Sequence, residues 1–218
     1  MSLRRPAKCT LFVAASLLTC SLGACSRGPS RVEPPGIDPA SAGSLAIEEY
    51  DSDSDGKIAG EELDNAPALR AALPRLDADG DGAVSADEVA ARVHAWKEMR
   101  TGLASVRCHV TLDGQPLAGA LVVFEPESFL GEEIKPASGT SNQFGDAAPS
   151  VARADLPDPT LPGGAHFGLY KVRITKPANG RETLPARYNS ATTLGQEVSY
   201  DDPGIENNNL TFALKSGS

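Results

Sequence analysis

The sequence predicts a chain of two parts, a small α-helical segment followed by an all-β sandwich. Two observations carry this prediction. Residues 45–101 are acidic and rich in alanine, with apolar residues at helical spacing. From about residue 102 onward, Val, Thr and Phe alternate with polar residues, and clusters of Gly, Pro, Asn and Asp recur between the alternating runs. We therefore expect one domain over residues 45–103 and a second over residues 104–218.

Residues 1–24 are typical of a signal peptide. Three basic residues precede an apolar run over residues 10–22, which is too short for a stable membrane span. The following Leu-Gly-Ala-Cys, residues 22–25, resembles the lipobox of bacterial lipoproteins, in which the cysteine thiol is acylated and becomes the new N-terminus. The resemblance implies lipidation at Cys25 and a membrane-anchored position in the cell envelope, periplasmic or surface-exposed. The alternative is a soluble secreted protein cleaved one residue earlier.

Residues 25–44 are rich in Pro, Gly and Ser and show no apolar period. Such a composition predicts a flexible tether, partly extended by its prolines. We expect this tether to hold the folded parts away from the membrane.

The net charge limits the classes of binding partner, and the positions of the cysteines indicate whether any thiol is reactive. The whole chain carries a net charge of −9, and cleavage of the signal peptide, with its three positive charges, takes this to about −12. So acidic a chain is a poor partner for nucleic acid or anionic lipid and suits cations. Two of the four cysteines leave with the signal peptide and Cys25 is the expected lipid site. The remaining Cys108 alternates with apolar residues, which predicts a buried and unreactive thiol.

Two twelve-residue stretches of the helical segment carry the same pattern, and we call them the first loop (residues 51–62) and the second loop (residues 77–88). Each has aspartate at positions 1, 3 and 5, glycine at 6, an apolar residue at 8 and glutamate at 12. A hard cation prefers oxygen ligands, glycine permits the sharp turn, and the glutamate can close the shell with both oxygens. The expected Ca²⁺ ligands are Asp51, Asp53, Asp55, the carbonyl of Lys57 and Glu62 in the first loop, and Asp77, Asp79, Asp81, the carbonyl of Ala83 and Glu88 in the second.

On these residues the segment resembles the EF-hand family, and the resemblance implies calcium binding. Two copies in register are hard to obtain from a random acidic linker. The alternative is a decayed pair that keeps its shape without useful affinity. Ser85 at position 9 of the second loop can hold a bridging water, which the side chain of Ala59 in the first loop cannot do. The first loop is therefore expected to be the weaker site.

The connection between the loops is unusually short. Only fourteen residues, 63–76, separate them, fewer than two full-length EF-hand helices need. We expect Pro67 to lie in the first turn of a short helix, after Asp64 or Asn65 as cap, and Pro74 to limit the helix entering the second loop to about one turn. This predicts a compact, reduced pair, nearer to the loop–helix repeats of dockerins than to a calcium sensor.

The two loops should pair, and the last helix should be well formed. Ile58 and Val84, at position 8 of each loop, are expected to face each other. Ser85 and Glu88 form a capping box at the start of the helix, whose apolar face is Val89, Val93 and Trp96. Because the clustered carboxylates repel and the short helices offer little core, calcium should order this segment as a structural ion.

The β segment offers some six or seven short strands, which is typical of a β-sandwich. A first strand over residues 106–112 and a second through residues 120–124 flank an Asp113-Gly114 turn. Later strands are expected near residues 168–177, 196–202 and 209–215, with a weaker one near residues 138–147.

The order of turns and strands is more specific than their number. "VTLDGQPLAGALVVFEP", "GTSNQFGDA" and "FGLYKVRITKP" follow one another. This order resembles the carboxypeptidase-regulatory-like group of transthyretin-like, Ig-like sandwiches. The resemblance implies a fold and an adhesive or spacer role, with no activity.

The sequence does not predict an enzyme. His94, His109 and His166 open no zinc-binding motif, and we expect all three at the surface. The C-terminal "LKSGS" lacks the tyrosine and arginine of the transthyretin-like hydroxyisourate hydrolases. Neither a nucleophile elbow nor a phosphate-binding glycine loop is present in the sequence.

The partner of the sandwich, a protein or a glycan, stays open. A calcium-stabilised surface module that binds carbohydrate is the alternative function. Sugar sites generally need exposed aromatic side chains, and aromatic residues make up only 5% of the chain. We assign Phe124, Tyr170 and Phe212 to the core, which leaves Tyr188 and Tyr200 as candidates.

Overall fold

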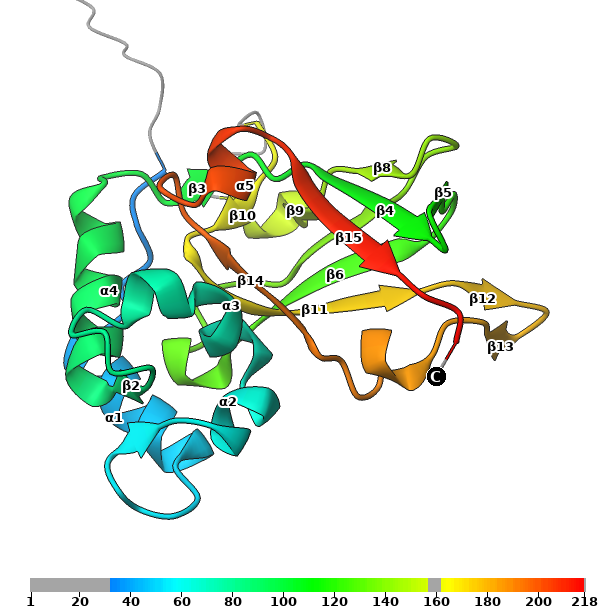
Figure 1. Cartoon of the computed structure of the whole chain (residues 1–218). Coiled ribbons are helices and arrows are strands. Elements are labelled where there is room, and N and C mark those ends of the chain that lie inside the picture. The colour runs from blue at the N-terminus through cyan, green and yellow to red at the C-terminus, as the bar shows by residue number, and fades with distance from the viewer. Residues whose placement is uncertain (1–31, 157–161, 218) are drawn as a thin grey trace, which may run out of the picture. The chain divides into compact units, whose positions relative to one another are not determined.

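Helices occupy the first part of the described chain and strands occupy most of the rest (Figure 1). The computed structural model describes residues 32–156 and 162–217. The predicted signal peptide and Cys25 lie outside these residues. The helices are α1 (Pro39–Tyr50), α2 (Glu61–Asn65), α3 (Pro67–Leu76), α4 (Ala86–Glu98) and α5 (Pro203–Glu206), with single 3-10 turns at Ser128–Leu130, Arg153–Asp155 and Ala186–Tyr188.

The larger sheet has the order β14-β11-β6-β7-β9, with antiparallel neighbours throughout. Its strands are β6 (Leu121–Pro126), β7 (Ala137–Thr140), β9 (Ser150–Val151), β11 (Gly168–Thr175) and β14 (Leu194–Val198). The fold is thus mixed, and its many antiparallel strands are consistent with the predicted β-sandwich.

A second sheet has the order β15-β4-β5, and β8 also pairs with β4. Its strands are β4 (Cys108–Leu112), β5 (Gln115–Pro116), β8 (Asp146–Ala147) and β15 (Leu210–Leu214). β15 runs parallel to β4, whereas β5 and β8 are antiparallel to it. Shorter pairs are β1 (Lys57–Ile58) with β2 (Val84–Ser85), β3 (Leu103–Ala104) with β10 (Ala165–His166), and β12 (Pro177–Ala178) with β13 (Arg181–Glu182).

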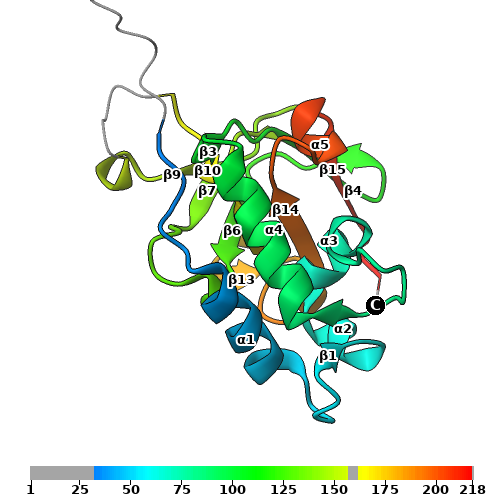
Figure 2. The same ribbon diagram turned by 90° about the vertical axis from the view of Figure 1, so that its left-hand side faces the viewer.

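Helix α1 begins inside the predicted tether. Asp38 is its N-cap and accepts the backbone N–H of Ser41 at 2.8 Å, and Pro39 occupies the first turn. The helix packs along α4 (Figure 2). A Cβ on Gly43 would lie 2.2 Å from the carbonyl oxygen of Ala86, so only glycine allows this approach. The prediction that the flexible tether extends to residue 44 is wrong, because small residues pack here without an apolar period.

Helix α3 is longer than predicted. It continues through Pro74 to Leu76, and Ala66 caps it without a side-chain bond, so the expected caps and the expected one-turn limit are both wrong. The helix lies against β14, where a Cβ on Gly195 would be 1.9 Å from the carbonyl oxygen of Pro67. Burial of one helix face against the sheet offsets the hydrogen bond that Pro74 removes.

Helix α4 forms as predicted. Ser85 accepts the N–H of Glu88, and Glu88 in turn accepts the N–H of Ser85, which completes the capping box. Its buried residues include the predicted apolar face, Val89, Val93 and Trp96. His94 is exposed, as predicted.

Helices and sheets share one apolar core, which includes residues from Ile37, just before α1, to Leu214 in β15. The described residues belong to one compact unit. The short helices, which were expected to offer little core of their own, therefore pack into a core that they share with the sheets. The first residues of the described chain contact the segment that connects α4 to the strands. The N–H of Gly102 in that segment donates to the carbonyl of Val32 at 2.7 Å.

Most predictions for single core residues hold. Phe124 lies 5.8 Å from Tyr170 and 6.2 Å from Phe212 between ring centroids, and all three are buried. Cys108 is buried too, and burial raises the pKa of its thiol to about 12. His166 is not at the surface as predicted; it is buried on β10 with Nδ1 3.1 Å from the carbonyl oxygen of Gly102, and burial lowers its pKa.

Candidate metal centre

The first loop is held by hydrogen bonds from its own backbone. Asp51 Oδ2 accepts the N–H of Gly56 at 2.9 Å, and Asp51 Oδ1 accepts the N–H of Asp55 at 3.2 Å. Asp53 accepts the same N–H of Asp55 at 3.1 Å, and Asp55 accepts the N–H of Lys57 at 2.8 Å. Gly56 has a φ of 86°, a backbone conformation that glycine adopts without strain. The loop therefore orders its three aspartates.

The second loop repeats these bonds at the equivalent positions. Asp77 Oδ2 accepts the N–H of Gly82 at 2.9 Å, and Asp77 Oδ1 accepts the N–H of Asp81 at 3.1 Å. Asp79 accepts from Asp81 at 3.1 Å, and Asp81 accepts from Ala83 at 2.9 Å. Gly82, with a φ of 82°, matches Gly56. The two loops thus make the same hydrogen bonds over positions 1 to 7.

Each loop gathers three carboxylate oxygens. One oxygen each from Asp51, Asp53 and Asp55 lies within 4.8 Å of the other two, and the same holds for Asp77, Asp79 and Asp81. The side chains are half-buried at position 1 of each loop and exposed at positions 3 and 5. Three hard, ionisable oxygens at this spacing suit a hard divalent cation.

The glutamates at position 12 close the loops through the backbone. Glu62 accepts the N–H groups of Ser52 at 2.7 Å and of Ala59 at 3.0 Å. These bonds, that from Ala59 most of all, lower the pKa of Glu62. Glu62 is therefore ionised at neutral pH, as a metal ligand must be.

Glu88 has the equivalent position in the second loop. It accepts the N–H groups of Ala78 at 2.9 Å and of Ser85 at 2.8 Å. Partial burial acts to raise its pKa, but the bonds from Ser85 and Ala78 outweigh burial, and the pKa is lowered. Ser85 also donates its hydroxyl to Glu88 at 2.9 Å. The position-9 hydroxyl, which the first loop lacks, therefore helps to orient the carboxylate at position 12.

The loops contact each other through β1 and β2, where Ile58 faces Val84 as predicted. A contact that sequence reasoning missed joins them as well. The Nζ of Lys57 forms an ion pair with Asp81 of the second loop. A hydrogen bond from this amine lowers the pKa of Asp81. The side chain at position 7, where the sequence analysis assigned a role only to the backbone carbonyl, thus contacts a predicted ligand of the other loop.

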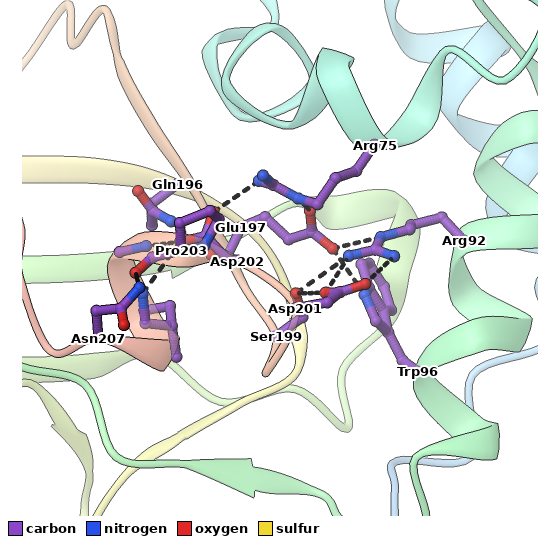
Figure 3. A network of polar contacts seen from close by, with 12 residues as sticks. Arg75, Arg92, Trp96, Gln196, Glu197, Ser199, Asp201, Asp202, Pro203 and Asn207 are labelled. Carbon is purple, nitrogen blue, oxygen red and sulfur yellow. Dashed lines mark hydrogen bonds and ion pairs between the residues drawn. The ribbon is translucent and has the colours of Figure 1, made fainter.

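A group of charged and polar side chains joins the second loop to the sheet, and we call it the interface network (Figure 3). Its members are Arg75, Arg92, Trp96, Glu197, Ser199, Asp201 and Asp202. Glu197, whose side chain is fully buried on β14, accepts from Arg75 at 2.6 Å, from Arg92 at 2.5 Å and from Trp96 at 2.8 Å.

Each arginine of the interface network also pairs with a second carboxylate. Arg75 pairs with Asp202 at 2.7 Å, and Arg92 pairs with Asp201 at 2.6 Å. Arg75 lies two residues before the second loop and Arg92 four residues after it. Glu197 therefore contacts both helices that flank this loop. A charged residue on an apolar helix face, such as Arg92 between Val89 and Trp96, is the sequence signal that could have revealed this network.

The first loop has a smaller link to the sheet. Tyr50, the residue before Asp51, donates its hydroxyl to Glu127 at 2.7 Å, and Lys171 lies 3.1 Å from the same carboxylate oxygen. Burial raises the pKa of Glu127, although the charge of Lys171 acts in the opposite direction. Its other oxygen, Oε1, is buried and has no hydrogen-bond partner within the described residues.

No protein-family model matches the chain, and neither a curated protein nor a solved structure does. The resemblances to EF-hand proteins, lipoproteins and transthyretin-like sandwiches therefore stay predictions. Across residues 32–156 and 162–217, no helix combines the length and the apolar character that a membrane span requires. The function proposed below depends on the two loops and their surroundings.

Proposed function

We propose that the two loops bind Ca²⁺ as a structural ion, in an EF-hand-like pair that belongs to a membrane-anchored lipoprotein of the cell envelope. The observation that supports calcium binding most strongly is the repetition of one loop geometry. Two stretches separated by fourteen residues make equivalent backbone bonds, and each gathers three aspartate oxygens within 4.8 Å.

Electrostatics also favours a cation in each loop. Three like charges this close repel one another, and partial exposure to water only weakens that repulsion. The loop backbone holds the carboxylates together despite the repulsion, through N–H groups such as those of Gly56 and Gly82. A structure that fixes such a charge cluster gains stability when a divalent cation neutralises it.

The ligands in this proposal are the predicted ones. In the first loop they are Asp51, Asp53, Asp55, the carbonyl of Lys57 and Glu62; in the second they are Asp77, Asp79, Asp81, the carbonyl of Ala83 and Glu88. Bound Ca²⁺ would supply charge neutralisation and cross-linking of the loop, and the chain's own residues would supply the oxygen shell.

The interface network supports a structural ion over a switching ion. A calcium sensor opens when the helices on either side of a loop change their angle. Here Arg75 and Arg92, one on each flanking helix, contact the same buried carboxylate of Glu197. Opening would break both pairs and leave a buried charge without a partner, which is strongly unfavourable.

Calorimetry tests the proposal directly. The full chain, in detergent, is titrated with CaCl₂ and with MgCl₂, and we expect calcium to bind. With an affinity near 10⁻⁴ M, millimolar calcium adds roughly 1.4 kcal/mol of stability per site. Glu62→Gln and Glu88→Gln should each remove about one site and its share of the thermal stabilisation, and the first loop should be the weaker.

Matched controls lie next to each glutamate. Glu61→Gln and Asp87→Asn remove the same charge at position 11 of each loop, outside the ligand set. They should leave calcium stoichiometry unchanged. The proposal fails if neither metal binds, or if the position-12 variants respond to calcium as their controls do.

A further inference from the structure

The second sheet has a cavity that the loops do not use. It has a volume of about 640 Å³ and lies over β4, β8 and the start of β15. Pockets of this size accommodate small organic ligands. Its polar lining includes Arg107, His109, Asn142, Asp146, Asn208 and Thr211. In Figure 1 these strands are grouped at the upper right, and the helices of the two loops at the lower left.

Strand register sets three of these side chains in one row. Asp146 of β8 faces His109 of β4, and His109 in turn faces Thr211 of β15. Directly paired residues point to the same face of a sheet, so the three side chains share the cavity face. His109 Nδ1 lies 2.9 Å from Asp146, which fixes the imidazole ring and leaves Nε2 for a ligand.

The turn that enters β8 carries an exposed aromatic ring. Asn142 Oδ1 accepts the N–H groups of Phe144 at 2.8 Å and of Asp146 at 3.1 Å, so the turn is fixed by its own side chain. Gly145 has a φ of 84°, and a Cβ there would lie 3.3 Å from the ring of His109. Phe144 is 61% exposed, more than any other large apolar side chain of the described chain. The turn therefore carries an exposed aromatic ring on the chain between Asn142 and Asp146, two residues that line the cavity.

The opposite rim supplies amide groups. Asn208 lies in the left-handed region with a φ of 52°, and Asn209 follows it directly into β15. The Asn209 carbonyl accepts the hydroxyl of Thr211 at 3.2 Å, which orders this rim. Arg107 adds a guanidinium group. Amide, guanidinium, imidazole and carboxylate groups together provide both donors and acceptors.

We propose that this cavity binds a neutral saccharide, with a sugar ring against Phe144 and its hydroxyls bonded to the polar row and the asparagine rim. Neighbouring hydroxyls need donors and acceptors at short spacing, which this lining offers and an apolar pocket does not. The CH face of a sugar packs on an aromatic ring. A polyanionic glycan fits less well, because Arg107 is balanced by Asp146 and the chain carries a net charge of −9.

This inference revises the sequence-based choice of aromatic residues. Tyr188, one of the two predicted candidates, is buried, and its hydroxyl accepts the N–H of Lys215 at 2.9 Å. Tyr200 is 48% exposed, but its hydroxyl donates to the carbonyl of Leu103 at 3.1 Å and its ring packs on Phe167. Phe144, which the sequence did not single out, is exposed and lies in the turn between the lining residues Asn142 and Asp146.

The test is retention of the full chain on a glycan array of neutral and acidic saccharides, in calcium buffer and a detergent without a sugar headgroup. We expect at least one neutral glycan to be retained. Phe144→Ala should weaken that retention at least about fivefold by removing the stacking ring. Asn208→Gly, which keeps the left-handed backbone and removes the amide, should weaken it as well.

The control variant is Leu121→Ala, which removes an exposed apolar side chain of β6 outside the cavity. It should bind as the unmodified chain does, and thermal unfolding of all three variants shows that they fold. Absence of any neutral glycan overturns the proposal. So does retention confined to acidic glycans, or retention that survives both cavity variants. Phe144→Ala should bind calcium as the unmodified chain does. Calcium titration of this variant therefore distinguishes a failure of the saccharide proposal from a failure of the calcium proposal.

Discussion

Glu127 is a buried carboxylate with only one of its oxygens hydrogen-bonded. Tyr50 and Lys171 both contact Oε2, Glu49 is a further negative charge near Lys171, and Oε1 has no partner within the described residues. Burial therefore raises the pKa of Glu127 above its ordinary value of 4.5. The native state keeps this proton to a higher pH than the unfolded state does.

That difference predicts a pH dependence. Where the native state binds more protons than the unfolded state, the free energy of unfolding falls as pH rises. The contribution of Glu127 is thus largest below pH 4.5 and declines as pH rises towards its native pKa. In thermal unfolding from pH 4 to pH 8, Glu127→Gln should lose this decline. Parallel curves for the two proteins would contradict the assignment; Glu125→Gln, at an exposed carboxylate of the same strand, is the control.

At the scale of elements, close backbone approach fixes how the helices meet their neighbours. Gly43 brings α1 onto the start of α4, and Gly195 brings β14 onto the first turn of α3. In both places the nearest atom is a backbone carbonyl oxygen, which cannot rotate away as the end of a side chain can. These two glycines therefore decide the positions of whole elements.

Gly195→Ala is the corresponding prediction. Its Cβ would lie 1.9 Å from the carbonyl oxygen of Pro67, so α3 or β14 must shift. We expect a loss of about 2–3 kcal/mol in the free energy of unfolding, typical of overpacking, measured in urea. Gly217→Ala meets nothing within 4 Å and should be neutral. Equal stability of the two variants would show that α3 adapts to the added methyl group.

Local signals in the sequence predicted the elements that depend on neighbouring residues. The Ser85–Glu88 capping box and the Asp113-Gly114 turn both form, the turn with φ of 51° and 82°. The failures lie where distant residues decide. Pro74 stays inside α3 because the sheet covers that helix. The sequence did not predict α1, because Gly43 and the small residues around it pack through close backbone contact with α4 and leave no apolar period in the sequence.

In the candidate site, too, local features were predicted from the sequence and contacts between distant residues were not. The grouping of three aspartates in each loop could be predicted from the sequence, because these residues lie within five positions of one another. The contacts that fix the loops in the molecule could not be predicted in this way. Arg92 and Glu197 are 105 residues apart, and no local pattern joins them.

At the scale of the whole molecule, the interface network joins the helical part to the larger sheet. Glu197→Gln leaves Arg75 and Arg92 without the buried charge that pairs them. We expect a loss of about 3 kcal/mol in the free energy of unfolding, as for other broken buried pairs. Urea unfolding measures this loss. It can be followed by the fluorescence of Trp96, the single tryptophan, whose indole N–H donates to Glu197.

The control for this change is an exposed pair. Arg173→Gln breaks the contact of Arg173 with Glu125, whose side chains are 42% and 39% exposed. Such a pair contributes less than about 1 kcal/mol. If Glu197→Gln costs no more than Arg173→Gln, the interface network does not hold the two parts together.

On the proposed function, the ion pair between Lys57 and Asp81 makes calcium binding an exchange of one cation for another. Before any metal arrives, the second loop already has a monovalent cation, the ammonium group of the first loop, at one of its proposed ligands. On the proposed function, a divalent ion entering the second loop displaces that ammonium group and returns it to the first loop's surroundings. Filling one loop therefore changes the charge around the other, although the two loops share no ligand.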